Sequence, residues 1–481
     1  MIVGVVLAAC GVSVGARAQS GQTNLPVAPS AVLTAPGAVT LRGPGGVVVE
    51  RATAGALPLG LDEAIDFGLK HNLQLELDRQ NMRVVQGETG QVINALLPSL
   101  TAVAKTGAQE IDLAAMGFKP ASLAKFGLGK NAIPEIVKVD TTSAQINVSQ
   151  QIFNLSAYEI YRAARAEAAV ADLQMRLSRG NVVLAAGTEY LRALADAAEI
   201  TDAQALLRQD EEALRQATER DNAGVGTRLD VLRAKVAMQA QQQALIAAEN
   251  TFAKDKITLN RTIGLPAEQE LKLTDTVPYA ELAELPLEQA KTLAYERRKD
   301  YTGLLAQRNV ADRERRAVKY ERVPTVAFGG FYGVLGETTG LYHGVFAAEG
   351  SVNFPIFREA QFRGEREVAD ASLSRLRNQI ADLKVTIDEQ IRASMLDVQA
   401  SAALVKVARS NVDLANEELS DANARFAAGV DDNLRVVEAQ AVVAQAETRL
   451  VETEFGYNQA KLALARNTGV VETQCKTYLG R

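Results

Sequence analysis

The stretch Leu229–Ala234, LDVLRA, recurs as LRVVEA at Leu434–Ala439, a shift of 205 residues (434 − 229). The same shift relates Arg261–Gly264, RTIG, to Arg466–Gly469, RNTG (466 − 261 = 205). One shift shared by two separate stretches indicates a tandem repeat, and a repeat decides the architecture of a chain before any local pattern does. The sequence therefore predicts two copies of one structural unit.

The beginnings of the two copies lie further apart than their ends. Leu61–Ala64, LDEA, matches Leu287–Ala290, LEQA, at a shift of 226 residues (287 − 61). At Phe153 and Phe357 the shift has fallen to 204 (357 − 153). The first copy therefore carries about 22 extra residues (226 − 204) between Pro98 and Phe153, and we expect them in a loop.

Each copy of the repeat reads as a helix, a β-hairpin, a very long helix, a tight turn and a shorter helix. Apolar residues within 358–427 step by three or four positions, which is the spacing of a coiled-coil seam. At about 1.5 Å per residue, each long helix would span roughly 100 Å, far more than the helices of ordinary globular domains. The sequence thus predicts a mainly α protein of long helical hairpins. The seam residues are Leu373, Leu376, Ile380, Leu383, Ile387, Ile391 and Met395, and the expected helices are 61–95, 155–221, 228–263, 287–321, 358–427 and 433–467.

The two expected hairpins alternate apolar and polar residues, as do strands with one wet and one oily face. Aromatic residues concentrate around the second hairpin although the chain is only 5% aromatic, and aromatic girdles are typical of barrel strands at a membrane boundary. A soluble hairpin packed on the helices is the alternative. Two hairpins close only a very small barrel, so the membrane interpretation predicts one barrel shared by several chains. The expected strands are 98–106, 144–153, 324–333 and 350–356, and the alternation is clearest where Ala144, Ile146 and Val148 are interleaved with Gln145, Asn147 and Ser149.

The composition excludes several classes of function. The 481 residues carry a net charge of −6, without the basic excess that nucleic-acid binding requires. The chain has no Trp and two His, and His71 and His343 are isolated, so we interpret both as structural. We find no catalytic constellation and expect no enzyme activity, no cofactor and no metal site. No run of about 18 apolar residues follows the first residues, so a membrane crossing would require a closed β-barrel.

The N-terminal residues read as an export signal. Residues 1–18 contain a short apolar stretch and a small-residue site for cleavage after Ala18. Lipidation at Cys10 is the alternative, and both interpretations take the mature protein out of the cytoplasm. Residues 19–57 are rich in Pro, Gly and Ala and are expected to be a flexible linker. Cys475 is expected in a frayed tail, which disfavours a disulfide with Cys10.

In the order of these features, the chain resembles the outer-membrane efflux protein family, of which TolC is typical. The resemblance implies a homotrimer in which each chain gives four strands to a 12-strand barrel and its helices to an α-barrel tunnel in the periplasm. It rests on Leu59–Ile65 with Asn72, on Pro98 and Pro324, and on the two tips Gly224–Val231 and Gly429-Val430 followed by Leu434. It divides the chain into a first repeat 58–264, a connecting segment 265–286, a second repeat 287–470 and a tail 471–481.

The resemblance also implies a function. Such a chain is the outer-membrane exit duct of a tripartite efflux system or a type I secretion system, and it conducts substrates passively. Its partners would be other copies of itself, outer-membrane lipid, a periplasmic adaptor and an inner-membrane pump, with no nucleic acid. A periplasmic coiled-coil scaffold or adhesin stalk is the alternative. The cargo, whether drug, metal or protein, stays open.

In this family the helical tips meet the adaptor, and charges just past the tips narrow the entrance. The resemblance therefore implies an adaptor contact at Gly224, Val225, Gly226, Thr227, Gly429 and Val430. The family carries acidic residues past the second tip, whereas this chain has Arg435 and Glu438 there. Asp230 and Arg233 hold the matching places past the first tip with the signs reversed.

This reversal suggests a gate. Matching positions of a quasi-symmetric ring lie at one height, so Asp230 could face Arg435, and Arg233 could face Glu438. Four unrelated solvated charges are the alternative. A second expectation concerns the extra residues between Gly107 and Val139, which we expect outside the cell because barrel loops on that side tolerate length; a tag near Lys130 would test it.

Overall fold

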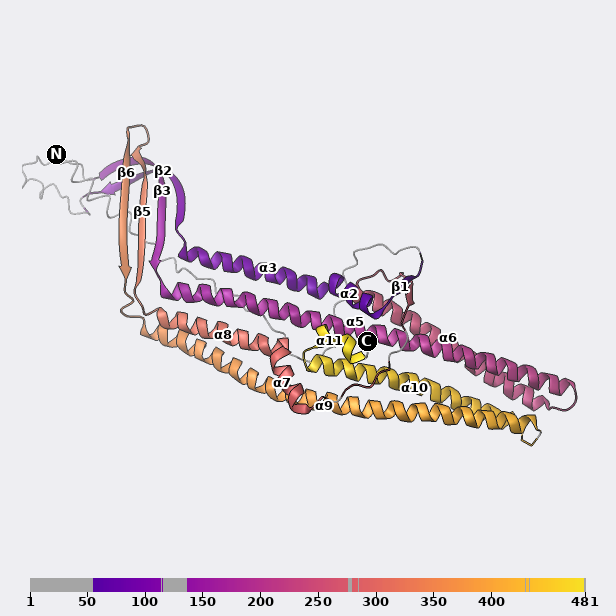
Figure 1. The fold of residues 1–481 in the computed structure, drawn as a ribbon. Helices are drawn as coiled ribbons and strands as arrows, with labels where there is room; N and C mark the ends of the chain where they lie inside the picture. The colour runs from indigo at the N-terminus through magenta and orange to yellow at the C-terminus, as the bar shows by residue number, and fades with distance from the viewer. Residues whose placement is uncertain are drawn as a thin grey trace, which may run out of the picture. The chain divides into compact units, whose positions relative to one another are not determined.

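The fold is described from a computed structural model, which describes residues 55–113, 115, 136–275, 279–283, 285–428, 430–431 and 433–479. These residues divide into two compact units (Figure 1). Unit 1 contains the described residues of 84–168 and 308–375, and unit 2 contains those of 55–83, 169–307 and 376–479. Each unit contains residues of both repeats. The long helices, residues 155–222 and 359–427, each begin in unit 1 and end in unit 2.

Unit 1 contains one antiparallel sheet of four strands in the order β2-β3-β5-β6 (Figure 1). The prediction of two hairpins is confirmed, and the central pairing of β3 with β5 joins the two repeats. The strands are longer than expected. The first part of the extra segment is strand rather than loop, since Gly107 pairs with Thr141 and Asp112 with Ile136. The rest of that segment, including Lys130, lies outside the described residues. The bounds are β2 Ser99–Asp112, β3 Ile136–Phe153, β5 Thr325–Glu337 and β6 Tyr342–Asn353.

The sheet has one mainly apolar face and one mainly polar face, and the mainly polar face also carries Val103, Phe331, Leu335 and Val345. On the apolar face, Ile146 is opposite Tyr332, and Tyr332 is opposite Phe346. These aromatic rings are not covered by the rest of the chain, since Tyr332 is 71% and Phe346 is 78% exposed. On the polar face the rows run through Gln145, Asn147 and Ser149. The polar face also carries Thr101, Lys105, Ser143, His343 and Glu349.

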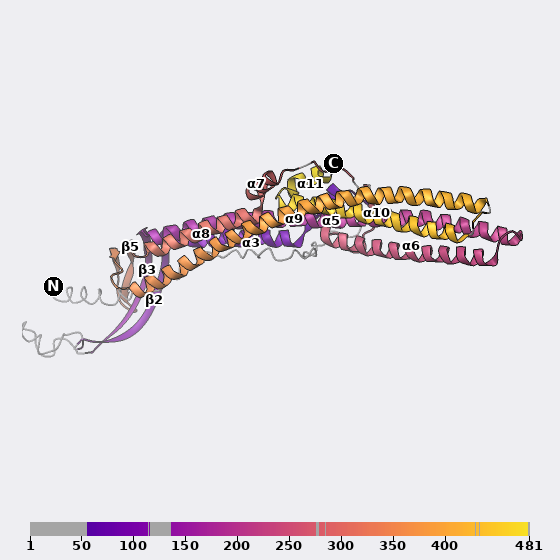
Figure 2. The ribbon, with the colours of Figure 1, turned by 90° about the horizontal axis from the view of Figure 1, so that it is seen from below.

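The helices follow the predicted order in both repeats (Figures 1 and 2). Two of them, α6 and α10, begin and end at the expected residues. Each first helix, expected as one piece, is instead broken into two. The bounds are α2 Leu61–His71, α3 Leu73–Ile93, α5 Leu155–Asn222, α6 Arg228–Ile263, α7 Leu287–Arg297, α8 Lys299–Tyr320, α9 Glu359–Ala427, α10 Asn433–Asn467 and α11 Val471–Leu479, with a 3-10 turn η1 at Asn94–Leu96 and a small parallel sheet of β1 Leu57–Leu59 and β4 Leu271–Leu273.

The break in the first helix recurs in the second repeat and has a physical cause. Asn72 and Arg298, 226 residues apart (298 − 72), both have extended backbone, with ψ of 129° and 123°. In unit 2 a left-handed glycine sits against each break: Gly264 has φ +84° and Gly469 has φ +77°. A Cβ on Gly264 would lie 2.6 Å from the Cβ of His71, and one on Gly469 would lie 2.6 Å from the backbone nitrogen of Arg298. Each first helix therefore breaks where the turn that ends the last helix packs against it.

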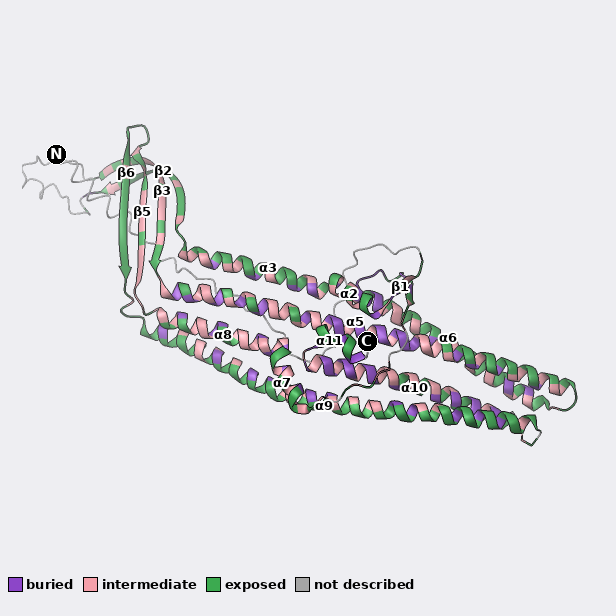
Figure 3. Cartoon of the chain, in the orientation of Figure 1, coloured by how far each residue is buried: buried purple, intermediate pink, exposed green. Residues whose placement is uncertain are grey.

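The core of unit 2 surrounds α5 and is closed by the C-terminal helix (Figure 3). Tyr190 is fully buried there, and α11 adds Cys475, Tyr478 and Leu479 to the same cluster. The expectation of a frayed end was wrong, because the sequence alone did not show that α11 has a core to cover. A second cluster buries much of the predicted seam of α9, namely Ile380, Leu383, Ile387 and Ile391. In the described part of the chain, none of the helices has a stretch long and apolar enough for a membrane span.

Candidate functional site at the helical tips

The first tip is a tight turn that two glycines allow. After α5 ends, the backbone N–H groups of Val225 and Gly226 both donate to the carbonyl of Arg220, at 3.0 Å and 2.9 Å. Gly224 has φ +72°, a conformation that favours glycine. A Cβ on Gly226 would lie 2.9 Å from the Cβ of Arg220, so the chain also needs its small size. The turn leaves Val225 74% exposed, which makes it available to a partner.

Thr227 and Asp230 form a capping box at the start of α6. The backbone N–H of Asp230 donates to Thr227 Oγ1 at 3.2 Å, and the backbone N–H of Thr227 donates to Asp230 Oδ2 at 3.2 Å. The Thr227 hydroxyl donates to the same carboxylate at 2.6 Å. Such a box satisfies N–H groups that a helix start leaves unpaired. Asp230, predicted as a gate residue, therefore also holds the turn together.

The second tip has the same exposed apolar residue but different charges. Gly429 lies outside the described residues. Val430 is 74% exposed, as Val225 is. Past this tip the Arg435 guanidinium lies 3.2 Å from Glu438 within α10, and both side chains are exposed. A crossing pair between Arg435 and Asp230 would have to compete with this local pair and with the capping box, so the proposed gate stays a prediction.

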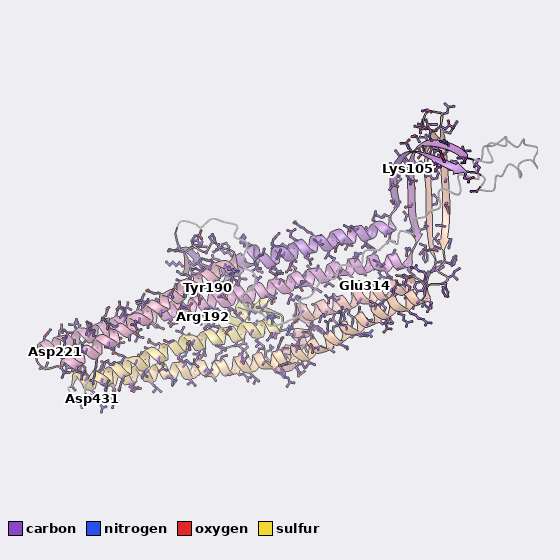
Figure 4. The ribbon with its side chains drawn as sticks, turned by 180° about the vertical axis from the view of Figure 1, so that it is seen from behind. Lys105, Tyr190, Arg192, Asp221, Glu314 and Asp431 are labelled. Carbon is purple, nitrogen blue, oxygen red and sulfur yellow. The ribbon has the colours of Figure 1, made fainter. Side chains whose placement is uncertain are left out.

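A cation–aromatic contact in unit 2 joins the two hairpins near their tips. The guanidinium of Arg220 on α5 lies 4.3 Å from the ring centroid of Phe426 on α9. Asp221, in the last turn of α5, and Asp431, which follows the second tip, are labelled in Figure 4 and show where the two tips lie. Such a contact at a partly exposed site contributes about 0.5–1 kcal/mol. The sequence did not indicate it, because the two residues come from different repeats.

Further from the tips, in unit 2, an arginine bridges two carboxyl groups, of which Asp196 is buried and Asp255 is partly exposed. Arg192 Nε lies 3.2 Å from Asp196 Oδ1 and 3.5 Å from Asp255 Oδ2 (Arg192 is labelled in Figure 4). Burial raises the pKa of Asp196 to about 7, and a hydrogen bond with Asp255 acts in the same direction. Burial also raises the pKa of Asp210, to about 6. The helical part of the chain therefore holds carboxyl groups that change charge near neutral pH.

A buried lysine fixes the connecting segment to α10. Lys461 is fully buried; its Nζ donates to the carbonyl of Ala280 at 3.2 Å and lies 4.4 Å from the ring centroid of Tyr457. The Tyr457 hydroxyl accepts a hydrogen bond from the N–H of Leu282 at 2.9 Å. Desolvation lowers the pKa of Lys461 to about 8. These contacts, with the guanidinium of Arg409 3.7 Å from the Tyr279 ring centroid, hold residues 279–282 against α9 and α10.

Comparison with known proteins gives this architecture a family. The model of the family described as "Outer membrane efflux protein" matches residues 65–265 and 292–470. The chain belongs to the outer membrane efflux protein family. The two matched segments fall on the two repeats. Membership places the chain in the outer membrane with an extension into the periplasm, in a family of transport channels rather than of enzymes.

Relatives and solved structures agree with this assignment. The alkaline protease secretion protein AprF of Pseudomonas aeruginosa is 22% identical over 343 residues, covering 69% of this chain and 70% of its own. The pyoverdine export outer membrane protein OpmQ of Pseudomonas putida is 24% identical over 355 residues, covering 69% and 73%. The structure of the Campylobacter jejuni CmeC outer membrane channel is similar with a TM-score of 0.73 at 13% identity, covering 87% of this chain and 89% of its own. For VceC of Vibrio cholerae the TM-score is 0.70 at 17% identity, with 85% and 96% covered.

Proposed function

We propose that three copies of this family member form the exit duct of a tripartite efflux system or a type I secretion system. The duct conducts substrates passively from the periplasm or the pump to the exterior. The observation that carries the proposal is the four-stranded sheet with one mainly apolar and one mainly polar face, attached to helices as long as 69 residues. A sheet of this kind can cross a membrane only when it closes into a barrel, because an open edge would leave backbone N–H and C=O groups unpaired in lipid.

Sharing one barrel among three copies accounts for the unpaired edges of the sheet. The outer strands β2 and β6 each have one neighbour within the described chain. Three copies would supply twelve strands, above the roughly eight that a typical small barrel requires. The exposed rings of Tyr332 and Phe346 would then face lipid, and the polar face would line the channel.

Exposed apolar stripes on the helices support association of the same copies. On α9, Val385, Leu396 and Val407 are 69%, 65% and 56% exposed and follow one another at steps of 11 residues, which keeps them on one side of the helix. Val236, Ile246 and Ile257 form a comparable stripe on α6. Leu414, 60% exposed and seven residues beyond Val407 (414 − 407), lies on the same side of α9, and exposed apolar residues that recur along one side of a helix are typical of a protein–protein contact. Neighbouring copies would cover these stripes and close the periplasmic tunnel.

The tips are the part of the duct that we assign to the adaptor. Val225 and Val430 are matching residues of the two repeats and are equally exposed. Three copies would present six such tips. A periplasmic adaptor and an inner-membrane pump would complete the path of the substrate through the cell envelope.

Membrane extraction and planar-bilayer conductance test the proposal together. We expect the protein to stay in the membrane after a high-pH wash, to need detergent for extraction, to scatter light as a trimer and to conduct ions in a bilayer. A periplasmic scaffold would wash off and would not conduct. A water-soluble monomer without conductance would overturn the proposal.

A further inference from the structure

The two outer strands of the sheet are staggered. Through the strand register, Lys105 of β2 lies in one row with Ser143, Leu335 and His343 of β6. Beyond this row β2 continues for seven residues to Asp112 (112 − 105), whereas β6 extends only one residue, to Tyr342 (343 − 342). The opposite end is reversed. Ser99, the first residue of β2, shares a row with Glu349, and β6 continues four residues further (353 − 349).

A closed barrel requires a stagger between copies. Strands in barrels tilt by about 35–45°. Four strands about 4.8 Å apart occupy about 19 Å of circumference, so each copy is displaced along the strands by about 13–19 Å, or about four to six residues. The displacement must be an even number of residues, because an odd one would turn the polar face of the next copy towards lipid. We therefore consider displacements of four and six.

The strand ends decide the direction of the displacement. If β2 of the next copy is moved towards the helical end of β6, a displacement of four pairs Ser99 with Asn353, and one of six pairs Asp112 with Tyr342. All 12 residues of β6 find partners in both cases. Movement in the opposite direction leaves at most four residues paired (a displacement of four would put Ser99 opposite Val345). The two edge strands can therefore pair along their length only if β2 of the next copy is displaced towards the helical end of β6.

The two hairpins of one chain are displaced relative to each other in the same direction. Ser99 corresponds to Thr325 by the repeat shift (325 − 99 = 226), but the row of Ser99 contains Gly329. The second hairpin is therefore already displaced by four residues (329 − 325) towards its helical end relative to the first.

The allowed displacements bring two unpaired charges of opposite sign together. At six residues, Lys105 lies directly opposite Glu349 of the next copy, where Cβ atoms are about 4.5–5.5 Å apart. At four residues it lies opposite Ala347, and Glu349 is the diagonal neighbour at about 7–8 Å, within reach of a lysine. Both side chains belong to the polar face. Among the described residues neither makes an ion pair, whereas Lys138, the other lysine of the sheet, lies 2.8 Å from Glu110.

We propose that Lys105 of one copy and Glu349 of the next form an ion pair on the channel-facing side of each boundary between copies (Lys105 is labelled in Figure 4). The partner of each outer strand is thus a second copy of this chain, displaced by four to six residues. The inference rests on the proposed trimeric duct. The pair forms at a displacement of four or six residues, whereas zero displacement or movement in the opposite direction would leave Lys105 and Glu349 out of reach of each other in the channel wall.

Cysteine cross-linking tests the register directly. In a Cys475→Ala background, Lys105→Cys is combined with Glu349→Cys or with Ala347→Cys, and the detergent-extracted trimer is oxidised. We expect one of these combinations to convert most of the monomer band into covalent dimers and trimers on a non-reducing gel. Lys105→Cys with His343→Cys, which would report zero displacement, is the matched control and should stay monomeric, as should each single variant.

Charge reversal tests the ion pair in the same preparation. Lys105→Glu should reduce the fraction of trimer that survives heating in detergent, and Lys105→Glu with Glu349→Lys should restore it. Lys138→Glu, which reverses the other lysine of the sheet, should have a smaller effect. A trimer that cross-links through residue 343, or not through 347 or 349, overturns the inference and leaves the duct in place. A wild-type protein that is monomeric in detergent overturns the duct as well.

Discussion

At the scale of single residues, the glycines that end α6 and α10 show how much one side chain can disturb. Gly469 combines a left-handed backbone with a contact that leaves no space for a Cβ against Arg298. The need for small residues at such turns is readable from the sequence, because RTIG and RNTG recur in register. Their partners were not readable, since the contacts join residues about 170 to 190 positions apart (469 − 298 and 264 − 71).

We expect Gly469→Ala to lower the thermal stability of the detergent-extracted protein by about 1–3 kcal/mol, because it adds backbone strain to a steric clash. Gly456→Ala is the matched control, since Gly456 lies inside α10 with nothing within 4 Å of a Cβ. That change should be neutral or stabilising by up to about 1 kcal/mol. Circular dichroism during heating measures both. Equal melting temperatures for the two variants would contradict the assigned contact.

Asp196 predicts a pH dependence of stability. Its pKa is raised to about 7 in the folded chain, above the ordinary value of 3.8 for an aspartate, so the folded state binds the proton more tightly than the unfolded state. The contribution to stability is therefore fully present below about pH 4 and is lost as the pH rises towards 7. One proton gives a slope of at most about 1.4 kcal/mol per pH unit.

We expect Asp196→Asn to flatten this slope between pH 4 and pH 7, as measured by chemical denaturation at several pH values. Arg192 and Asp255 face Asp196 and stay in place, and the charge of Glu199 also raises the pKa of Asp196. Glu211→Gln, at an exposed position elsewhere on α5, is therefore a suitable control for a general change of charge. An unchanged slope in Asp196→Asn would mean that Asp196 does not carry the proton.

At the scale of elements, the sequence predicted the helices and strands well because their signals are local. The ends of α6 and α10 follow from the tip glycines and the repeat, and the strand alternation follows from the two environments of a sheet. The breaks at Asn72 and Arg298 did not follow, because the pattern of apolar residues runs through them and the cause is the packing of another turn. Helix α11 was missed for a related reason: nine residues are a helix only when a core lies beneath them.

The connecting segment offers a prediction at this scale. We expect Tyr457→Phe to weaken the attachment of residues 279–282 by about 0.5–1.5 kcal/mol, because the partly buried N–H of Leu282 would lose its hydrogen-bond partner. Limited proteolysis should then cleave this segment faster than in the wild type. Lys406→Ala, which removes an exposed ion pair with Glu281, should change the rate little. Protection equal to the wild type in Tyr457→Phe would show that the hydroxyl does not hold the segment.

At the scale of the whole molecule, the entrance charges remain to be tested. Exposed pairs contribute only about 0.2–1 kcal/mol each, so a gate would depend on their threefold repetition. We expect Arg435→Asp to raise the resting conductance in planar bilayers, and the addition of Asp230→Arg to lower it again. Because Asp230 also caps α6, Asp230→Asn is needed as a control that keeps the cap. A double variant that conducts like Arg435→Asp alone would rule out the crossing pair.

The pairing of β3 with β5 joins the two repeats inside each sheet, so three chains would contribute six hairpins built on one plan. If six identical subunits formed the channel, every position at one height around it would hold the same residue. A fused chain has two independent sets of three, and each set can mutate without the other. Asp230 and Arg435 hold matching places with opposite signs, and so do Arg233 and Glu438. Duplication followed by fusion thus permits alternating charge around an opening, a pattern that a ring of six equal copies cannot encode.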